Sequence, residues 1–383
     1  MLHDLGDSNF NRFKFAPAQV ENVKIQSVEA FPISIKADES LKGGTFDYSH
    51  YSTVLVKAVM GGAEGWGEAM TRSDPAATSA LVRYLAKGII GNELDNIQKI
   101  WEVVWRGLRV RGHTRGVEVE ALSGIELALY DALGKIERKP LGKMLSSHPA
   151  SSVPVFAGSL FASRGPLEVQ VEVAKQYELA GAKVKVGFAV EEDHSILKTV
   201  RSLWKDAMLV ADANGAYDVT SAAKACDAFA DLDLAWFEEP VLSDDLDGYA
   251  SLRGKGVKIG AGESWFVGDF RKPIEERLVD VIEPSVSRCG GLRVEVDVAK
   301  RAVSAGLSFS PMTGMNSVIS LAASIHAASV VNSIGVEFNP FPNPLQRELA
   351  AGLEQPRKGK IEVPTGDGLG LKIDDHFIRS HSS

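Results

Sequence analysis

Residues 182–263 contain four short apolar runs that end in polar side chains: Ala182-Lys183-Val184-Lys185-Val186, Met208-Leu209-Val210-Ala211-Asp212-Ala213-Asn214, Trp236-Phe237-Glu238-Glu239-Pro240 and Ile259-Gly260-Ala261-Gly262-Glu263. Lys185, Asp212, Glu238 and Glu263 follow one another at intervals of 27, 26 and 25 residues. Such an interval holds a strand of about five residues, a helix of about a dozen and two short loops. Each run is therefore predicted to be a strand of a βα repeat, with its polar residues at the carboxyl end.

The repeat extends to both sides of this stretch. One more strand is expected before it, at 154–157, and three after it, at 280–283, 307–310 and 334–338. Eight such strands predict a parallel barrel, in which the carboxyl ends of all strands meet at one mouth. The helix after the eighth strand is expected to be short or irregular, because three prolines interrupt residues 339–344.

The first 150 residues have a different pattern. Residues 1–22 are polar and irregular and are expected to form an N-terminal arm. Alternating apolar and polar residues predict strands at 23–31 and 54–59, and Gly61-Gly62 predicts a hairpin turn before a third strand at 63–68. Residues 75–145 have a helical pattern. We therefore expect an α+β domain over residues 23–150 and the barrel over residues 151–345.

Two further segments complete this organisation. Residues 37–52 are rich in glycine, serine and aromatic side chains and are interpreted as a loop that is long enough to form a lid. Tyr48 and His50 lie in this segment and are candidates for substrate binding. Residues 346–383 alternate again before a glycine-rich turn at 366–370, and they are expected to fold back onto the first domain.

The composition is that of an ordinary globular protein. The chain has 42 Lys and Arg against 50 Asp and Glu, which gives a formal net charge of -8 without a basic stripe. Nucleic acid is therefore not an expected partner. Only Cys226 and Cys289 are present, and we found neither a secretory start nor a run of 18 apolar residues. These features predict a cytoplasmic protein without a membrane span.

The polar strand ends predict a metal site. Three carboxylates at one barrel mouth, from Asp212, Glu238 and Glu263, repel one another unless a hard cation such as Mg²⁺ lies between them. Lys183 and Lys185 are two residues apart on a strand, so both point into the barrel. A neighbouring ammonium and a nearby cation are expected to lower the pKa of the other lysine, which would make it a usable base.

These motifs resemble those of the enolase superfamily, in the mandelate racemase/muconate lactonizing enzyme family. The resemblance rests on Lys183-Val184-Lys185, Asp212-Ala213-Asn214, Glu238-Glu239-Pro240, Gly262-Glu263 and Gly290-Gly291 in this order, and it is greatest for galactarolactone cycloisomerase-like members. It implies an α/β fold: a (β/α)7β-type TIM barrel with an N-terminal α+β capping domain that is completed by the C-terminal tail.

The resemblance also implies roles for individual residues. Asp212, Glu238 and Glu263 would bind Mg²⁺, Lys185 would be the base, and Lys183 would assist at the substrate carboxylate. Glu337, after the eighth strand, matches the position of the acid that bonds the substrate carboxylate, and Asn214 is a candidate for contact with the substrate or the lysines. Family members often form closed homo-oligomers, so a homo-oligomer is expected.

The sequence departs from the family pattern at two positions. Ser285 stands where these enzymes usually have an aspartate, and Met312 stands where they usually have the histidine of a second base. Neither side chain shuttles protons as imidazole does. Racemisation needs proton delivery on both faces of the α-carbon, whereas elimination needs only one base.

We therefore predict a lyase or isomerase that removes the proton α to a carboxylate through an enediolate, with Lys185 as base. Dehydration or cycloisomerisation of a sugar acid or its lactone is favoured. The alternatives are a racemase or epimerase, and an altered relative that binds acid sugars without turnover. A phosphate-binding barrel is a third possibility, which Thr313-Gly314-Met315-Asn316 supports only weakly.

Overall fold

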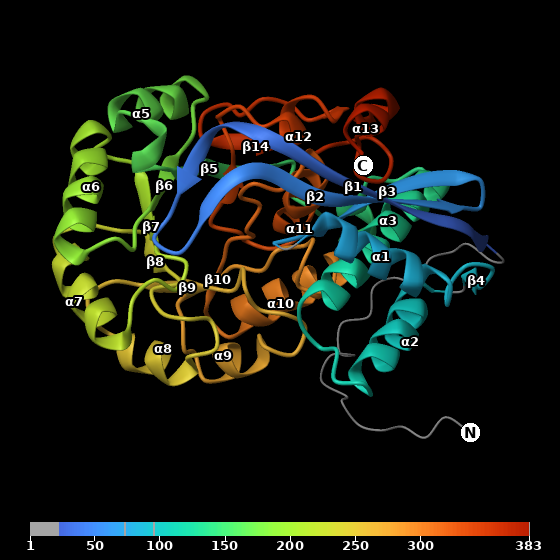
Figure 1. Cartoon of the computed structure of the whole chain (residues 1–383), viewed down its shortest axis with the longest axis horizontal. Coiled ribbons are helices and arrows are strands. Elements are labelled where there is room, and N and C mark those ends of the chain that lie inside the picture. The colour runs from blue at the N-terminus through green and yellow to red at the C-terminus, as the bar shows by residue number, and fades with distance from the viewer. Residues whose placement is uncertain (1–22, 73, 95, 383) are drawn as a thin grey trace.

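A four-stranded antiparallel sheet and four helices form the N-terminal part of the protein (Figure 1). The computed structural model describes residues 23–72, 74–94 and 96–382, so the expected arm at residues 1–22 lies outside the described residues. The strands lie in the order β3-β2-β1-β4. Their bounds and those of the helices are β1 Val23–Lys42, β2 Asp47–Met60, β3 Ala63–Met70, β4 Glu93–Leu94, α1 Pro75–Ala86, α2 Ile97–Arg109, α3 Val117–Glu137 and α4 Leu141–Leu145. We call this unit the capping domain.

The longest of these helices, α3, packs directly on β3, and glycines make the close approach possible. A Cβ atom on Gly65 would lie 2.0 Å from the carbonyl oxygen of Ala128, and one on Gly67 would lie 2.1 Å from that of Gly124. Nearly all of α3 is buried as a result. The helix therefore forms the centre of the capping domain, with the sheet on one side and the barrel on the other.

The segment at residues 37–52 is not the loop that was predicted. It forms most of a β-hairpin, in which Lys36 pairs with His50, Leu41 with Tyr48 and Lys42 with Asp47. The glycines and aromatic residues of this segment suggested a loop. The alternation of the two strands is not regular along the sequence, because the pairing contains a register shift between Lys36 and Leu41. Residues 43–46 form its turn, which we call the hairpin tip. In Figure 1 the hairpin extends from the capping domain across the barrel.

Eight parallel strands form the barrel, as predicted. They are β5 Ser152–Leu160, β6 Gly181–Lys185, β7 Met208–Asp212, β8 Trp236–Glu238, β9 Ile259–Ala261, β10 Val281–Ile282, β11 Ser308–Phe309 and β12 Val336–Phe338. Neighbouring strands pair in sequence order, and β12 returns to pair with β5. Between β11 and β12 the backbone N–H of Ile334 donates to the carbonyl oxygen of Phe309 at 3.0 Å.

Helices on the outside of the barrel connect these strands. They are α5 Leu167–Gln176, α6 Val190–Leu203, α7 Val219–Phe229, α8 Leu246–Leu252, α9 Arg271–Glu275, α10 Leu292–Ser304 and α11 Val318–Ser329. The last barrel strand is followed directly by the four-residue α12, Pro344–Arg347. The predicted (β/α)7β barrel is therefore confirmed, including its irregular eighth unit. Its interior is filled below the mouth by Phe156, Val210, Trp236 and Val281, all at most 1% exposed.

The C-terminal tail contacts both parts of the chain. Its strand β14 Lys360–Glu362 pairs antiparallel with β5, and β13 Ala350–Ala351 pairs with β15 Lys372–Ile373. The last helix, α13 Asp375–His381, is followed by a β-bridge between Ser382 and Ile33 of β1. The predicted return of the tail to the capping domain is thus observed.

Buried carboxylates of the capping domain join it to the barrel. Glu68 of β3 accepts hydrogen bonds from the backbone N–H groups of Ser317 and Ser320 and from the Ser317 hydroxyl, at the start of α11. Glu126 of α3 accepts from the N–H groups of Leu292 and Arg293, at the start of α10. Negative charge at a helix N-terminus is favourable because the N–H groups there lack intrahelical partners. The orientation of the capping domain is therefore fixed by directional bonds.

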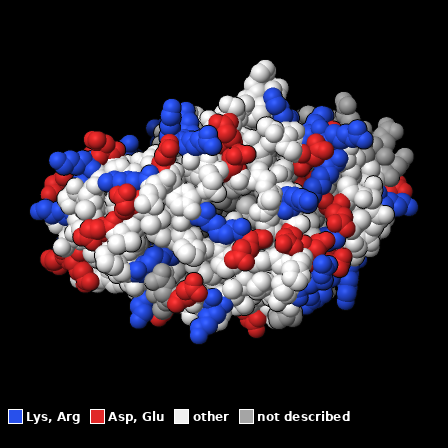
Figure 2. Space-filling view, turned by 90° about the horizontal axis from the view of Figure 1, so that it is seen from above, with Lys and Arg blue, Asp and Glu red and all other residues white. Residues whose placement is uncertain are grey.

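In Figure 2 acidic and basic side chains alternate over the visible face. Among the described helices, none combines the length and the apolar character that crossing a membrane requires.

His326 of α11 is a buried polar link to the tail. Its Nδ1 accepts the N–H of Gly142, and its Nε2 bonds to the carbonyl oxygen of Leu369 at 3.2 Å. Burial lowers the pKa of His326 to about 4, from an ordinary value of 6.5. The folded protein thus holds the neutral imidazole, whereas the unfolded chain binds a proton below pH 6.5.

We expect this histidine to make the protein sensitive to acid. Its contribution to the free energy of unfolding is fully present above pH 6.5 and is lost as the pH falls towards 4, by up to about 3 kcal/mol. Denaturant unfolding at several pH values should show a steeper loss between pH 6.5 and 4 in the wild type than in His326→Asn. Equal slopes for the two proteins would contradict the assignment.

Candidate active site

Lys183 lies at the centre of the barrel mouth. Its side chain points inward from β6, and the residue is 1% exposed. The ammonium contacts Glu238 at 3.0 Å and Asp212 at 3.2 Å, and it forms an ion pair with Glu337. Burial lowers the pKa of Lys183, but the carboxylates around it, Glu238 first, outweigh burial and raise the pKa well above its ordinary value. Lys183 is therefore a fixed positive charge.

Lys185 lies on the same face of β6, closer to the open end. Its ammonium bonds to a carboxylate oxygen of Asp212 and to Oδ1 of Asn214, the latter at 2.7 Å. The ammonium also lies 5.3 Å from the centre of the Phe46 ring, which belongs to the hairpin tip. Burial lowers the pKa of Lys185, but the charge of Asp212 outweighs it, so that the pKa is raised. The attraction of Asp212 thus outweighs the repulsion of the Lys183 ammonium, so these protein charges by themselves do not produce the lowering that was predicted for a lysine beside a cation.

Asp212, Glu238 and Glu263 follow consecutive strands, as predicted. Asp212 and Glu238 are paired in the register of β7 and β8, and Glu263 comes two residues after β9. Glu263 accepts from Arg72 at 2.9 Å and from Asn214 at 2.8 Å. Burial would raise the pKa of Glu263, but Arg72 and the lysines outweigh burial and lower it to about 2.

Glu238 has the opposite surroundings. Burial, followed by the charge of Asp212, raises the pKa of Glu238 well above its ordinary value. Its Oε2 atom is buried and has no hydrogen-bond partner among the described residues. A buried carboxylate oxygen without a partner is costly and is a natural ligand for a cation.

These residues supply suitable donors for Mg²⁺. Within the part of the chain that the structure describes, no three Asp, Glu, His or Cys side chains are close enough together to hold a metal ion. Instead Lys183, Lys185 and Arg72 contact the three carboxylates. Three hard oxygen donors on adjacent strands, one of them with a free oxygen, nevertheless fit the ligand preference of Mg²⁺.

Asn214 connects Lys185 to the carboxylates. Its Oδ1 accepts from Lys185, its Nδ2 donates to Glu263, and its backbone N–H donates to Asp212 at 3.1 Å. The residue has a φ of 45°, in the left-handed region that asparagine adopts more readily than most residues other than glycine. Asn214 can therefore bond to both neighbours without unusual backbone strain.

The two positions that depart from the family pattern, Ser285 and Met312, hold no side chain that carries a proton as imidazole does. Ser285 is fully buried, and its hydroxyl lies 3.3 Å from that of Ser287 and accepts from Asn316. Met312 lines the cavity at the mouth. The structure thus places an apolar thioether where the family pattern has an imidazole.

The remaining predicted residues differ in position. Glu337 pairs with Lys183 and also accepts from the N–H of Gly314, so both of its oxygens have protein partners. Tyr48 lines the cavity, whereas His50 is exposed, bonds to Ser49 and is not part of the cavity wall. The prediction that His50 binds substrate therefore has no support from its position.

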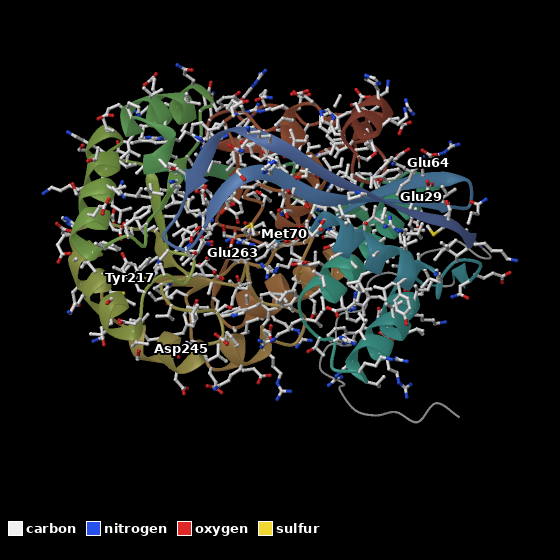
Figure 3. The ribbon with its side chains drawn as sticks, viewed as in Figure 1. Glu29, Glu64, Met70, Tyr217, Asp245 and Glu263 are labelled. Carbon is white, nitrogen blue, oxygen red and sulfur yellow. The ribbon has the colours of Figure 1, made fainter. Side chains whose placement is uncertain are left out.

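A cavity of about 40 Å³ lies between the capping domain and the barrel. Its walls are formed by Tyr48, Met70, Arg72, Ser159, Phe161, Lys183, Lys185, Asn214, Glu263, Met312, Gly314 and Met315. Figure 3 shows Met70, at the end of β3, close to Glu263 of the barrel. No sequence pattern pointed to Arg72, because nothing in its neighbourhood shows that the end of β3 meets the barrel mouth.

Two family profiles match the chain. The profile described as enolase C-terminal domain-like matches residues 167–377, and that of the mandelate racemase/muconate lactonizing enzyme N-terminal domain matches residues 38–146.

Individual proteins are similar over most of the chain. D-galactarolactone cycloisomerase of Agrobacterium fabrum is 29% identical, covering 92% of this chain and 97% of that protein. Arabinonate dehydratase of Saccharolobus solfataricus is 27% identical, covering 84% of this chain and 87% of that protein. The crystal structure of a racemase from Streptomyces coelicolor with bound magnesium has a TM-score of 0.85 and 25% identity, covering 94% of this chain and all of that one.

The hairpin tip closes the cavity only because it approaches the barrel closely. A Cβ atom on Gly44 would lie 2.3 Å from the carbonyl oxygen of Gly187, which follows β6. Nearby, the N–H of Lys42 donates to Ser163, and the hydroxyl of Thr45 donates to the carbonyl oxygen of Asn214.

We expect Gly44→Ala to lift the hairpin tip from the barrel without unfolding the protein. Hydrogen exchange should show faster exchange, by about tenfold or more, at the amide of Lys42, while the melting temperature changes little. Gly107→Ala is the matched control, because a Cβ atom there meets nothing within 4 Å. Unchanged exchange at Lys42 in Gly44→Ala would show that the contact does not hold the tip.

Proposed function

The chain belongs to the mandelate racemase/muconate lactonizing enzyme family of the enolase superfamily, and from this we propose that Lys185 removes a proton α to the carboxylate of a sugar acid or its lactone. The bond to an oxygen on the neighbouring carbon then breaks. The reaction is a dehydration when that oxygen is a hydroxyl group and a cycloisomerisation when it belongs to a ring. The two named relatives are enzymes of these two kinds.

The asymmetry of the cavity is the observation that carries this proposal. Lys185, held by Asp212 and Asn214, enters the cavity from the end of β6, whereas Met312 enters it from the segment after β11, three strands away around the closed barrel. An α-carbon placed between them can lose its proton to Lys185 but can receive none from a thioether. This arrangement favours elimination, and it disfavours the alternative of a racemase or epimerase.

The carboxylates of Asp212, Glu238 and Glu263 would hold Mg²⁺. When bound, Mg²⁺ supplies a Lewis acid that makes the α-proton of a nearby carboxylate more acidic. The free oxygen of Glu238 and the excess of buried carboxylates support this assignment. The relative from Streptomyces coelicolor, which was crystallised with magnesium, is consistent with it.

Lys183, Glu337 and Asn214 contribute through their charge or by positioning a neighbouring group. Lys183 is a permanent ammonium, so it can stabilise the two negative oxygens of the enediolate that forms when the proton leaves. Glu337 holds the Lys183 ammonium in place from β12. Asn214 orients the amine of Lys185. The Lys185 ammonium must first release Asp212 and give a proton to solvent, because only the neutral amine can accept the α-proton.

We expect Lys185→Met to abolish both proton removal and product formation. In D₂O with Mg²⁺, proton NMR of galactarolactone or arabinonate with the wild-type enzyme should show loss of the α-proton signal and a new keto-deoxy product. The variant should show neither, which is a loss of at least about 10³-fold. Lys198→Met, on the outer helix α6, is the matched control and should behave as the wild type.

Different results would support different conclusions. Normal turnover in Lys185→Met would exclude this lysine as the base. A wild-type enzyme that binds these acids with Mg²⁺ but neither exchanges nor converts them would favour an altered relative that does not catalyse the reaction.

We also expect Mg²⁺ to stabilise the folded protein. A ligand at one hundred times its dissociation constant adds about 2.7 kcal/mol to the free energy of unfolding. The melting temperature of the wild type should therefore rise by several degrees with Mg²⁺, and that of Glu238→Gln should not. Asp231→Asn, an exposed change outside the mouth, is the control and should keep the full rise. An equal rise in Glu238→Gln would place the cation elsewhere.

A further inference from the structure

Tyr48 and Arg72 form a pair on the capping side of the cavity. The Arg72 guanidinium donates a hydrogen bond to the Tyr48 hydroxyl at 3.1 Å, and its other terminal nitrogen donates to Glu263 at 2.9 Å. Because the Tyr48 oxygen accepts this bond, its own proton is free to donate to another group. Both side chains line the cavity that also contains Lys185.

Phe46 fixes where Tyr48 lies relative to the base. The rings of Phe46 and Tyr48 are 4.4 Å apart, and the same Phe46 ring lies 5.3 Å from the Lys185 ammonium. Tyr48 therefore adjoins the residue that covers Lys185, and it approaches the cavity from the hairpin rather than from the barrel. A substrate whose α-carbon faces Lys185 would place its neighbouring carbon towards the capping domain.

We propose that Tyr48 is the acid that protonates the leaving oxygen and that Arg72 is the positioning residue that stabilises the resulting phenolate. This inference rests on the proposed elimination and supplies the second proton transfer that the loss of a hydroxyl group requires. It assigns to the hairpin a chemical role in addition to the covering of the site.

The step balances in atoms and electrons. The C–H bond next to the carboxylate breaks, and its proton goes to the Lys185 amine. The C–O bond on the neighbouring carbon breaks with its electron pair on oxygen, and this oxygen takes the Tyr48 proton and leaves as water. Solvent then reprotonates Tyr48, Lys185 returns its proton to solvent, and the enol product becomes the keto acid. No redox reagent is consumed.

The other polar groups of the cavity wall are less suited to this role. Arg72 does not deprotonate in proteins. Lys183 is held by three carboxylates, and Glu263 is an ionised acceptor with a lowered pKa. The Ser159 hydroxyl is a far weaker acid than a phenol. Only the Lys185 ammonium, formed after the first proton transfer, competes with Tyr48, and the experiment distinguishes the two.

The test compares leaving groups in Tyr48→Phe, with Mg²⁺ present. The two compounds differ in their leaving groups. Arabinonate must lose a hydroxyl group, which needs a proton, whereas opening galactarolactone releases a carboxylate, which does not. We expect product formation from arabinonate to fall by about 10²–10⁴-fold, while conversion of the lactone changes less than about threefold. Exchange of the arabinonate α-proton with D₂O should continue, because Lys185 is intact.

A matched control separates the hydroxyl group from the fold. Tyr51, on the same strand, donates its hydroxyl to the carbonyl oxygen of Pro342 at 2.7 Å and does not line the cavity. Tyr51→Phe should retain both reactions. Arg72→Met should reproduce the leaving-group dependence of Tyr48→Phe, and Arg72→Lys should restore part of the arabinonate rate.

Several outcomes would overturn the assignment. Full arabinonate turnover in Tyr48→Phe would show that the Lys185 ammonium delivers both protons. Equal losses of exchange and product for both compounds would assign Tyr48 to binding alone. A wild-type enzyme that converts only the lactone would leave no hydroxyl for Tyr48 to protonate. A wild type inert to both compounds, without exchange, would instead refute the proposed function itself.

Discussion

The buried charge of Lys183 is the constraint on which the barrel mouth depends. An isolated ammonium in the interior of a protein would be strongly unfavourable, so carboxylates must lie beside it and balance its charge. Asp212, Glu238 and Glu337 provide them from β7, β8 and β12, which are on both sides of β6 around the barrel. Since these strands meet only when the barrel closes, the charge pairing and the closure stabilise each other.

The same constraint leaves the mouth rich in negative charge. The lysines and Arg72 neutralise part of it, and Glu238 retains a buried oxygen without a partner among the described residues. A site of this kind is stable without a substrate, yet it can exchange ammonium contacts for a divalent cation and a substrate carboxylate. Polar groups that are satisfied in alternative ways are typical of catalytic sites, and here they are concentrated at strand ends of a rigid barrel.

The capping domain adds the groups that the barrel lacks. Its orientation depends on Glu68 and Glu126, which bind the N-termini of α11 and α10. These bonds hold β2 and β3 so that Tyr48 and Arg72 reach the cavity. A domain attached by loose apolar contact would not place a hydroxyl group within a fraction of an ångström, which proton transfer requires. The buried carboxylates of the interface therefore help to fix the position of the groups that the capping domain brings to the cavity.

The sequence by itself determined the barrel and the residues that the barrel presents. Period-two strands at intervals of 25 to 27 residues permit few arrangements, and alternation decides that Lys183, Lys185, Asp212 and Glu238 point inward. The sequence also shows that residue 312 is a methionine and not the histidine of the family pattern. The sequence did not reveal that residues 37–52 form a hairpin, that His50 faces away from the cavity, or that Arg72 binds both Tyr48 and Glu263. Periodicity reports the environment of a residue within its own element, whereas these contacts join residues up to 191 positions apart. Only the docking of the two domains brings Arg72 to Glu263. The pKa of Lys185 also depends on the tertiary structure, because the pairing of β6 with β7 places the charge of Asp212 beside its ammonium.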